Sequence, residues 1–336
     1  MKQTIDIPTF TILRFILIIL GLVFLYLIRD ILLMLFIALI IAAAAGGPVD
    51  WLARHKVRRV FGAAIVYLLA FLVLALFVYL VFPPLAVQIK TLAADLPHYI
   101  SGLGANIENL HQRFGTYASQ GFLEEVSARL SGMASNVVGA AVSIFGGIFS
   151  AGIVLVISIY LVIQDKDIKN FLSTITPPQH RVYVLSLADR IQSKLGGWLR
   201  GQFILMAVIG VLIYIGLTLL KVKFALTLAL IAGLMEIIPY VGPIIAATPA
   251  VILAFFQSPV LALLVLGLFV LVQQIENYLI VPQVMKRAVG LNPLVIIISM
   301  IIGGKLAGIL GVVVAVPLAA ALSVFLSDIF KRGEAS

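Results

Sequence analysis

The sequence predicts an all-α, polytopic transmembrane protein with two broken, re-entrant helical hairpins and amphipathic helical loop regions. Of its 336 residues, 62% are hydrophobic and only 11% are charged, and the mean hydropathy is +1.19. A soluble domain carries about 25% charged residues. Apolar runs recur along nearly the whole chain, and a helix needs about 20 apolar residues to cross the hydrocarbon core of a bilayer. The composition therefore predicts several membrane-spanning helices.

Residues 1–82 hold three apolar runs and form the predicted N-terminal transmembrane region. Phe10 to Ile28 and Ile31 to Ala45 are separated only by Arg29-Asp30, and Val60 to Phe82 ends at two prolines. The first run lacks a small-residue cleavage site, so we expect a retained span rather than a signal peptide. The second run is short for a crossing, and the sequence leaves open whether it spans.

Two longer polar regions follow, at residues 83–139 and 164–200, and a fourth apolar run at 140–163 separates them. Cytoplasmic loops of membrane proteins carry an excess of lysine and arginine. The loop from Gly46 to Arg59 and the region 164–200 are rich in basic residues, whereas 83–139 is not. This pattern predicts that 83–139 is extracytoplasmic, that 164–200 is cytoplasmic, and that both chain termini lie in the cytoplasm.

Within 164–200, apolar residues recur every three or four positions, at Leu185, Ala188, Ile191, Leu195 and Trp198. This spacing predicts an amphipathic helix. Such a helix lies on the membrane surface or docks on the rest of the protein, and docking is the simpler interpretation. The apolar run from Gly201 to Leu220 follows as a fifth predicted span.

Residues 201–326 form the predicted transport core, and residues 327–336 form a cytoplasmic tail. Within the core, residues 224–256 consist of two short apolar arms on either side of "PYVGP". Each arm is below the minimum of about 17 residues for crossing a bilayer. Proline cannot donate to the helix ladder and glycine tolerates sharp turns. We therefore predict a helical hairpin with its tip at Pro239 to Pro243.

Residues 293–326 are interrupted in a similar way, after one uninterrupted apolar run from Val260 to Val281. The predicted break is "GGKLAG", Gly303 to Gly308. A re-entrant hairpin returns to the side from which it entered, so two hairpins that flank one crossing enter from opposite sides. Two broken segments of opposite orientation are typical of secondary transporters built from inverted repeats, whose binding site lies near the midplane.

Ionisable residues are rare in these apolar segments. Glu236 lies one turn before the first predicted tip, and Lys305 lies within the second. A charge at bilayer depth costs about 2.5 to 3.5 kcal/mol on insertion scales. Glu236 therefore has either a role in ion coupling or substrate contact, or a structural contact with Lys305 or with backbone that holds the tips together.

A further polar patch consists of Gln273, Gln274, Glu276 and Asn277, because positions three and four apart share a helix face. It either lines a pathway, makes interhelical hydrogen bonds or lies at the membrane interface. The glycines of the second break fit close helix packing equally well. The residues expected to line a substrate or ion pathway are Glu236, Pro239, Tyr240, Gly242, Pro243, Gln273, Glu276, Asn277, Gly303, Gly304 and Lys305.

Several classes of function are excluded by what the sequence lacks. The net charge of +9 does not indicate nucleic-acid binding, because the basic residues lie in loops between apolar runs. The chain has no cysteine, and its four histidines all lie in polar regions, so we expect no metal site. It also lacks a phosphate-loop motif, a paired-histidine zinc motif and a nucleophile elbow. We expect that the protein is not an enzyme, has no catalytic residue, needs no cofactor and does not hydrolyse ATP.

Three stretches carry a resemblance to a known family: "KLGGWLRGQ", "IPYVGP" and "ENYLIVPQVMKRAVGLNPLVIIISMIIGGKLAGILGVVVAVPLAAAL". With these residues the chain resembles the autoinducer-2 exporter family of bacterial membrane transporters. The resemblance implies a multi-pass protein of the bacterial inner membrane, surrounded by the lipid bilayer. It also implies a homo-oligomer, such as a pentamer, that exports a small polar signal molecule of quorum sensing. Some relatives resemble sodium/proton antiporters, so a monovalent cation stays open as the cargo. A passive channel or membrane scaffold is the alternative from another class.

Overall fold

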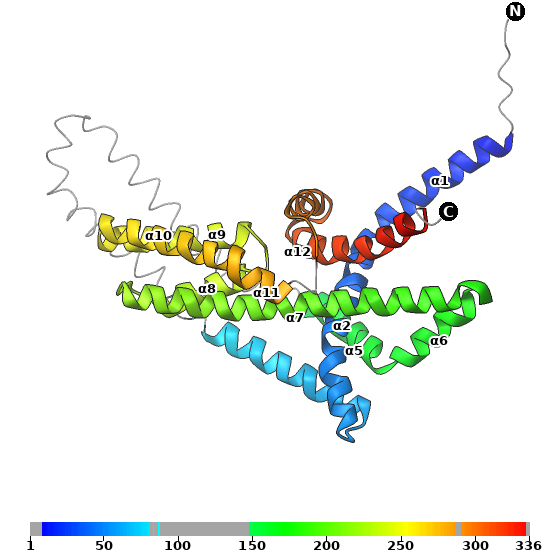
Figure 1. Cartoon of the computed structure of the whole chain (residues 1–336), viewed down its shortest axis with the longest axis horizontal. Helices are drawn as coiled ribbons and strands as arrows, with labels where there is room; N and C mark the ends of the chain where they lie inside the picture. Colours follow the sequence, from blue (N-terminus) through cyan, green and yellow to red (C-terminus); the bar gives the residue numbers. More distant parts are fainter. Residues whose placement is uncertain (1–8, 81–82, 84–86, 88–147, 286–289, 334–336) are drawn as a thin grey trace, which may run out of the picture.

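The computed structural model describes residues 9–80, 83, 87, 148–285 and 290–333, and every regular element within them is helical (Figure 1). By length and composition, five helices can cross a membrane: Arg29–Arg54, Arg59–Leu80, Pro178–Leu219, Pro259–Met285 and Pro293–Asp328. The chain is therefore an all-α, multi-pass membrane protein, as predicted. The extracytoplasmic region expected at 83–139 falls, apart from two single residues, outside the described residues.

The chain begins with α1 (Thr9–Leu27) and α2 (Arg29–Arg54). The large apolar side chains of α1 are exposed, as expected of a helix that faces lipid. The second apolar run does not end at Ala45 as predicted, because α2 continues through Pro48 to its end at Arg54. A proline removes a single hydrogen bond from the ladder, and the small, buried residues before it let α2 pack closely on its neighbours. With 26 residues, α2 is long enough to span.

The helix Arg59–Leu80 and α5 (Ile148–Ile163) pack beside α2. Arg59 joins these elements at one end. Its Nε donates a hydrogen bond to the carbonyl oxygen of Val162 at 2.8 Å, and its Nη2 lies 3.3 Å from Asp50 and 3.8 Å from Asp165. A single guanidinium thus fixes the end of the α2–α5 unit.

A short helix, α6 (Asp165–Ile175), leads from this unit through one turn, η1 (Pro178–His180), into α7. Lys169 of α6 lies 2.8 Å from Asp189 of α7, and this hydrogen bond raises the pKa of Lys169 above its ordinary value. Exposed ion pairs of this kind contribute about 0 to 1 kcal/mol, so they orient α6 more than they stabilise it.

A single helix of 39 residues, α7 (Arg181–Leu219), runs across the molecule and contacts most other elements (Figure 1). The sequence predicts two elements here, an amphipathic helix and a separate span. They are continuous because Gly196 and Gly201 do not interrupt the ladder; Gly196 instead lets α7 approach the backbone of α2 at Ala43. Leu195 and Trp198 are buried against α2 and the C-terminal helix. The apolar stripe therefore docks on the protein itself, as expected.

The second half of α7 forms the largest apolar core with α8 (Ala225–Met235), α9 (Val241–Gln257) and α10 (Pro259–Ile275). Three alanines at a four-residue spacing on α9 are fully buried there: Ala246, Ala250 and Ala254. Small residues at this spacing allow membrane helices to approach closely. The core therefore holds α9, one arm of the first hairpin, firmly against its neighbours.

The first hairpin is present as α8 and α9, but its turn lies at residues 236–240 instead of at "PYVGP". Gly242 and Pro243 belong to the first turn of α9, where the N–H groups have no partner within the helix and proline is tolerated. Glu236 therefore lies in the turn itself, not one turn before it. Tyr240 has φ +63°, a conformation that residues other than glycine rarely adopt.

The second hairpin lies within α12 (Pro293–Gly333), which reverses direction at Ala307 and Gly308. The backbones of Gly303 and Gly311 touch, although residues eight apart in a straight helix are about 12 Å from each other. The break is shorter than the predicted "GGKLAG". Glycine inside a helix costs only about 1 kcal/mol, so the first arm includes Gly303, Gly304 and Lys305, and only Gly308 takes a positive φ.

Candidate functional site

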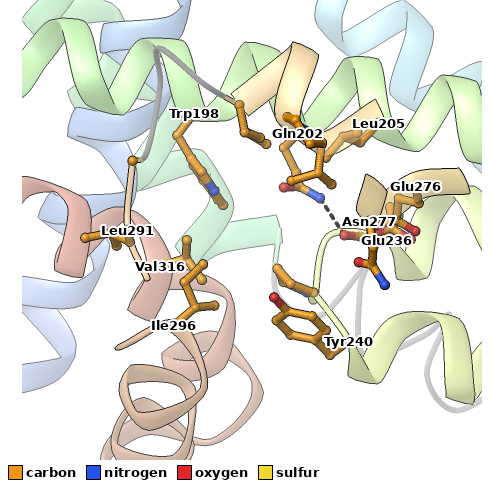
Figure 2. Close-up of a pocket in the computed structure, with 15 residues that line it drawn as sticks. Trp198, Gln202, Leu205, Glu236, Tyr240, Glu276, Asn277, Leu291, Ile296 and Val316 are labelled. Carbon is orange, nitrogen blue, oxygen red and sulfur yellow. Dashed lines mark hydrogen bonds between the residues drawn. The ribbon is translucent and has the colours of Figure 1, made fainter. Parts of the chain in front are cut away.

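A cavity of about 230 Å³ lies between α7, the turn of the first hairpin, the segment after α10, and α12 (Figure 2). Most of its wall is apolar, and the polar residues converge from three elements. The polar side chains are those of Gln202, Glu236, Tyr240, Glu276 and Asn277. Sites for small molecules typically combine an apolar wall with a few convergent polar groups. This cavity is therefore the candidate binding site.

Glu276 begins an irregular segment of the helix. After α10 the chain forms one π-helical stretch, η2 (Glu276–Ile280), and then α11 (Val281–Met285). Pro282 has no N–H to donate to the carbonyl of Tyr278, so the regular ladder cannot continue there. Single π-helical turns occur frequently at functional sites. The side chain of Glu276 is only 5% exposed, and its Oε2 accepts a hydrogen bond from Nε2 of Gln273 at 3.1 Å.

Glu236 meets Glu276 from the turn of the first hairpin. It is 1% exposed, and its carboxyl group lies beside that of Glu276 in the wall of the cavity. Its Oε2 is buried and has no hydrogen-bond partner among the described residues. Two ionised carboxylates side by side repel strongly in a buried site, and a proton or a cation bound between them relieves that repulsion.

Gln202 fixes the turn from the opposite side of the cavity. Its Nε2 donates a hydrogen bond to the backbone carbonyl of Glu236 (Figure 2). The side chain of Gln202 is 2% exposed, so this bond is made where water does not compete. The turn that carries Glu236 is thereby tied to α7.

The cavity wall carries little positive charge. Among the described lining residues there is no lysine, arginine or histidine. Lys194 of α7 approaches Gly290 at the rim, and Arg200 lies against Gly47 of α2, away from the cavity. Lys286 and Arg287 fall outside the described residues. No described basic side chain is therefore in place to neutralise the carboxyl pair.

The prediction that Glu236 contacts Lys305 is wrong. Lys305 is exposed on the first arm of α12 and forms no ion pair with Glu236, both being among the described residues. The break in α12 is confined to Ala307 and Gly308, so Lys305 lies in the last turn of the first arm, with its side chain exposed. The group that faces Glu236 is a second carboxyl, that of Glu276.

The other predicted residues divide into two groups. Pro239, Tyr240 and Asn277 line the cavity, as does Glu276. Three predicted glycines and one proline do not line this cavity. Gly242 is buried against the end of α8, and Gly303 and Gly304 face the return arm of α12. Pro243 borders a second, smaller void. Gly303 and Gly304 are thus close-packed against the return arm, whereas Gly308 supplies the positive φ of the reversal.

The second void is about 10 Å³, close to the minimum that holds a single water molecule. Gln273 and Glu276 are the polar groups that border it, and apolar side chains of α7, α8 and α10 enclose it. Glu276 is therefore in contact with two spaces, the large cavity on one side and a one-water void on the other.

Several residues that line the cavity were not expected from the sequence, among them Trp198 and Gln202. These two lie four positions apart on α7 and therefore share a face. Gln202 is a polar residue at the start of an otherwise apolar span, and polar residues in membrane helices usually face the protein interior. That signal was present in the sequence and would have identified Gln202.

The fold and the cavity define a multi-pass membrane protein with a polar site enclosed by helices. The chain belongs to the AI-2E transporter family, since the model described as "AI-2E family transporter" matches residues 15–331. It is 29% identical over 296 residues to "Putative transport protein YueF" of Bacillus subtilis (strain 168), covering 84% of this chain and 80% of that protein. It is 24% identical over 295 residues to "Putative permease PerM" of Escherichia coli (strain K12), covering 85% and 83%. The protein is therefore a membrane transporter.

Proposed function

We propose that the protein is a secondary transporter that exports a small polar molecule, such as the autoinducer-2 signal, across the bacterial inner membrane. The observation that carries this proposal is the cavity itself, in which Gln202, Tyr240 and Asn277 face two carboxyl groups. Amide and hydroxyl groups both donate and accept hydrogen bonds, which suits a hydroxylated solute. The lack of basic groups among the described lining residues favours a neutral or cationic cargo over an anionic one.

The arrangement of the cavity supports alternating access. Its wall includes Gly290 and Leu291, next to the loop that the sequence assigns to the cytoplasm, and the one-water void lies beyond Glu276. We propose that the cavity opens toward the cytoplasm. We propose that the two hairpins enter from opposite sides and are the elements that move, as in transporters with inverted repeats. The resemblance of the chain also favours a homo-oligomer.

Cation/proton antiport is the second candidate function. The observation that favours it is the pair of buried carboxyl groups, since oxygen atoms are the ligands of hard cations. In this case the cation itself is the cargo, and the cavity is its entrance.

Purified protein in liposomes tests both candidates. Vesicles loaded with autoinducer-2, with a neutral pentose as the comparison solute, should release the signal faster than protein-free vesicles when a proton or sodium gradient is imposed. Sodium flux without solute flux would favour the antiporter. Unitary ionic currents would indicate a channel, and the absence of any flux would indicate a scaffold and contradict the proposal.

A substitution pair sharpens this test. Gln202→Leu removes a polar group from the cavity, whereas Lys305→Gln neutralises an exposed residue outside it. We expect Gln202→Leu to slow the flux and Lys305→Gln to leave it unchanged. Equal flux in both variants would show that the solute does not pass through this cavity.

A further inference from the structure

We infer that Glu236 and Glu276 together form a binding site for one monovalent cation, a proton or a sodium ion, reached from the cavity and centred on Oε2 of Glu236. This inference rests on the proposed function, because it assigns the coupling site of that transporter. It goes further in naming the atoms, the charge of the bound ion and the number of ions per chain.

The first observation is the unpartnered oxygen. Oε2 of Glu236 is buried without a hydrogen-bond partner among the described residues, and the residue lines the cavity. Buried polar atoms in native proteins almost always have a partner, and each exception needs an explanation. An ion or proton that enters from the cavity and binds this oxygen supplies that explanation.

The second observation is the balance of charge. Two ionised carboxylates side by side in a buried site repel strongly, so the pair is less costly with one proton, which leaves one negative charge. An uncompensated charge in a low-dielectric interior is costly. Binding one monovalent cation at Oε2 brings the net charge of the pair from −1 to 0, by forming either an O–H bond or an oxygen–sodium contact. No bond other than this one changes, and nothing is oxidised or reduced.

Among the described residues, no basic side chain is placed to neutralise the carboxyl pair in place of a bound cation. Tyr240 is the only other ionisable side chain among the described residues that line either space. On α7, Lys194 lies at the rim and Arg200 lies against α2; α8, α9 and α10 have no ionisable side chain, and Lys305 of α12 is exposed. The negative charge of the pair is therefore available to a cation.

The placement of the two carboxyl groups links binding to movement. Glu236 lies in the turn of the first hairpin, whereas Glu276 lies on the π-helical segment after α10. A bound cation compensates the remaining negative charge of the pair. When it leaves, one uncompensated charge stays buried between the turn and the π-helical segment, which is costly. Departure of the cation therefore favours a movement of the turn that brings water to Glu236 and Glu276, and Glu276 lies between the cavity and the one-water void.

Infrared difference spectroscopy on the protein in lipid nanodiscs tests binding without measuring transport. We expect a protonated carboxyl band that changes when the pH is raised or when sodium is added. Glu236→Gln and Glu276→Gln should each abolish that change, whereas Asp30→Asn, a matched control that removes an exposed carboxylate, should retain it. Glu236→Asp should restore part of it, which separates loss of the carboxyl group from a general folding defect.

Two arms of the experiment distinguish the ions. Release of about one proton per chain on addition of sodium at constant pH would identify a site that sodium takes from the proton. A band that responds to pH but not to sodium would identify a proton site. Either result supports the inference, and a spectrum that is the same in the wild type and in both glutamine variants would overturn it. Loss of solute flux with an intact spectral change would refute the proposed cargo and leave the cation site standing.

Discussion

Gly242→Ala tests the structure of the first hairpin most severely, because there is no free space for a methyl group at this position. A Cβ at position 242 would collide with the backbone carbonyl of Met235 at the end of α8. Backbone atoms cannot move aside as a flexible side chain can. Overpacking costs about 1 to 3 kcal/mol, and we expect the upper end of that range here.

The control for this variant is Gly267→Ala. Gly267 lies on α10 with no atom within 4 Å of the place a Cβ would take. Alanine is a better helix former than glycine by about 1 kcal/mol, so the control should be as stable as the wild type or slightly more so. The two substitutions are chemically identical, and we expect them to change the stability of the protein in opposite directions.

Thermal unfolding of both variants in the same detergent, followed by tryptophan fluorescence, is the assay. A loss of about 3 kcal/mol in Gly242→Ala is a change of roughly a hundred-fold in the folding equilibrium, and it should lower Tm by several degrees. If Gly242→Ala unfolds at the same temperature as Gly267→Ala, the close approach of Gly242 to the carbonyl of Met235 is contradicted.

Three further predictions concern single contacts. Lys305→Met should leave both Tm and flux unchanged, because Lys305 is exposed and does not contact Glu236; a large loss of either would restore the tip-to-tip pair. Gln202→Leu leaves the carbonyl of Glu236 without a partner and should cost about 1 to 3 kcal/mol of stability, measured as a fall in Tm. Arg190 donates to Asp328 at 2.8 Å, and a double-mutant cycle with Arg190→Ala and Asp328→Asn should give a coupling of about 0.2 to 1 kcal/mol. A cycle that closes to zero would mean that this ion pair does not hold the end of α12 to α7.

The helical class, the existence of both hairpins and the docking of the α7 stripe were predictable from the sequence, because they follow from composition and spacing. Apolar residues at intervals of three or four fix one face of a helix, and Leu195 and Trp198 are buried on that face. The exact turns were not predictable. Pro243 marks the first turn of α9 and Gly303 lies inside an arm, because proline and glycine are tolerated at positions other than the tip.

The candidate site was predicted in part. Glu236 and Glu276 stand out as rare carboxyl groups in apolar segments, but the sequence does not give the distance between residues 40 positions apart. It therefore suggested Lys305, the opposite charge, as the partner of Glu236. The structure brings two carboxyl groups together instead. Only the packing of the hairpin turn against the π-helical segment decides this, and that packing depends on the shape of the whole core.

The most direct test of the account is uptake against a concentration gradient in proteoliposomes with an imposed proton or sodium gradient. We measure accumulation of autoinducer-2 by the wild type, Glu276→Gln and the control Asp30→Asn. We expect that the wild type and Asp30→Asn accumulate the solute, whereas Glu276→Gln folds and equilibrates it but no longer accumulates it. Accumulation by Glu276→Gln at the wild-type level would contradict the claim that the carboxyl pair couples transport to a cation.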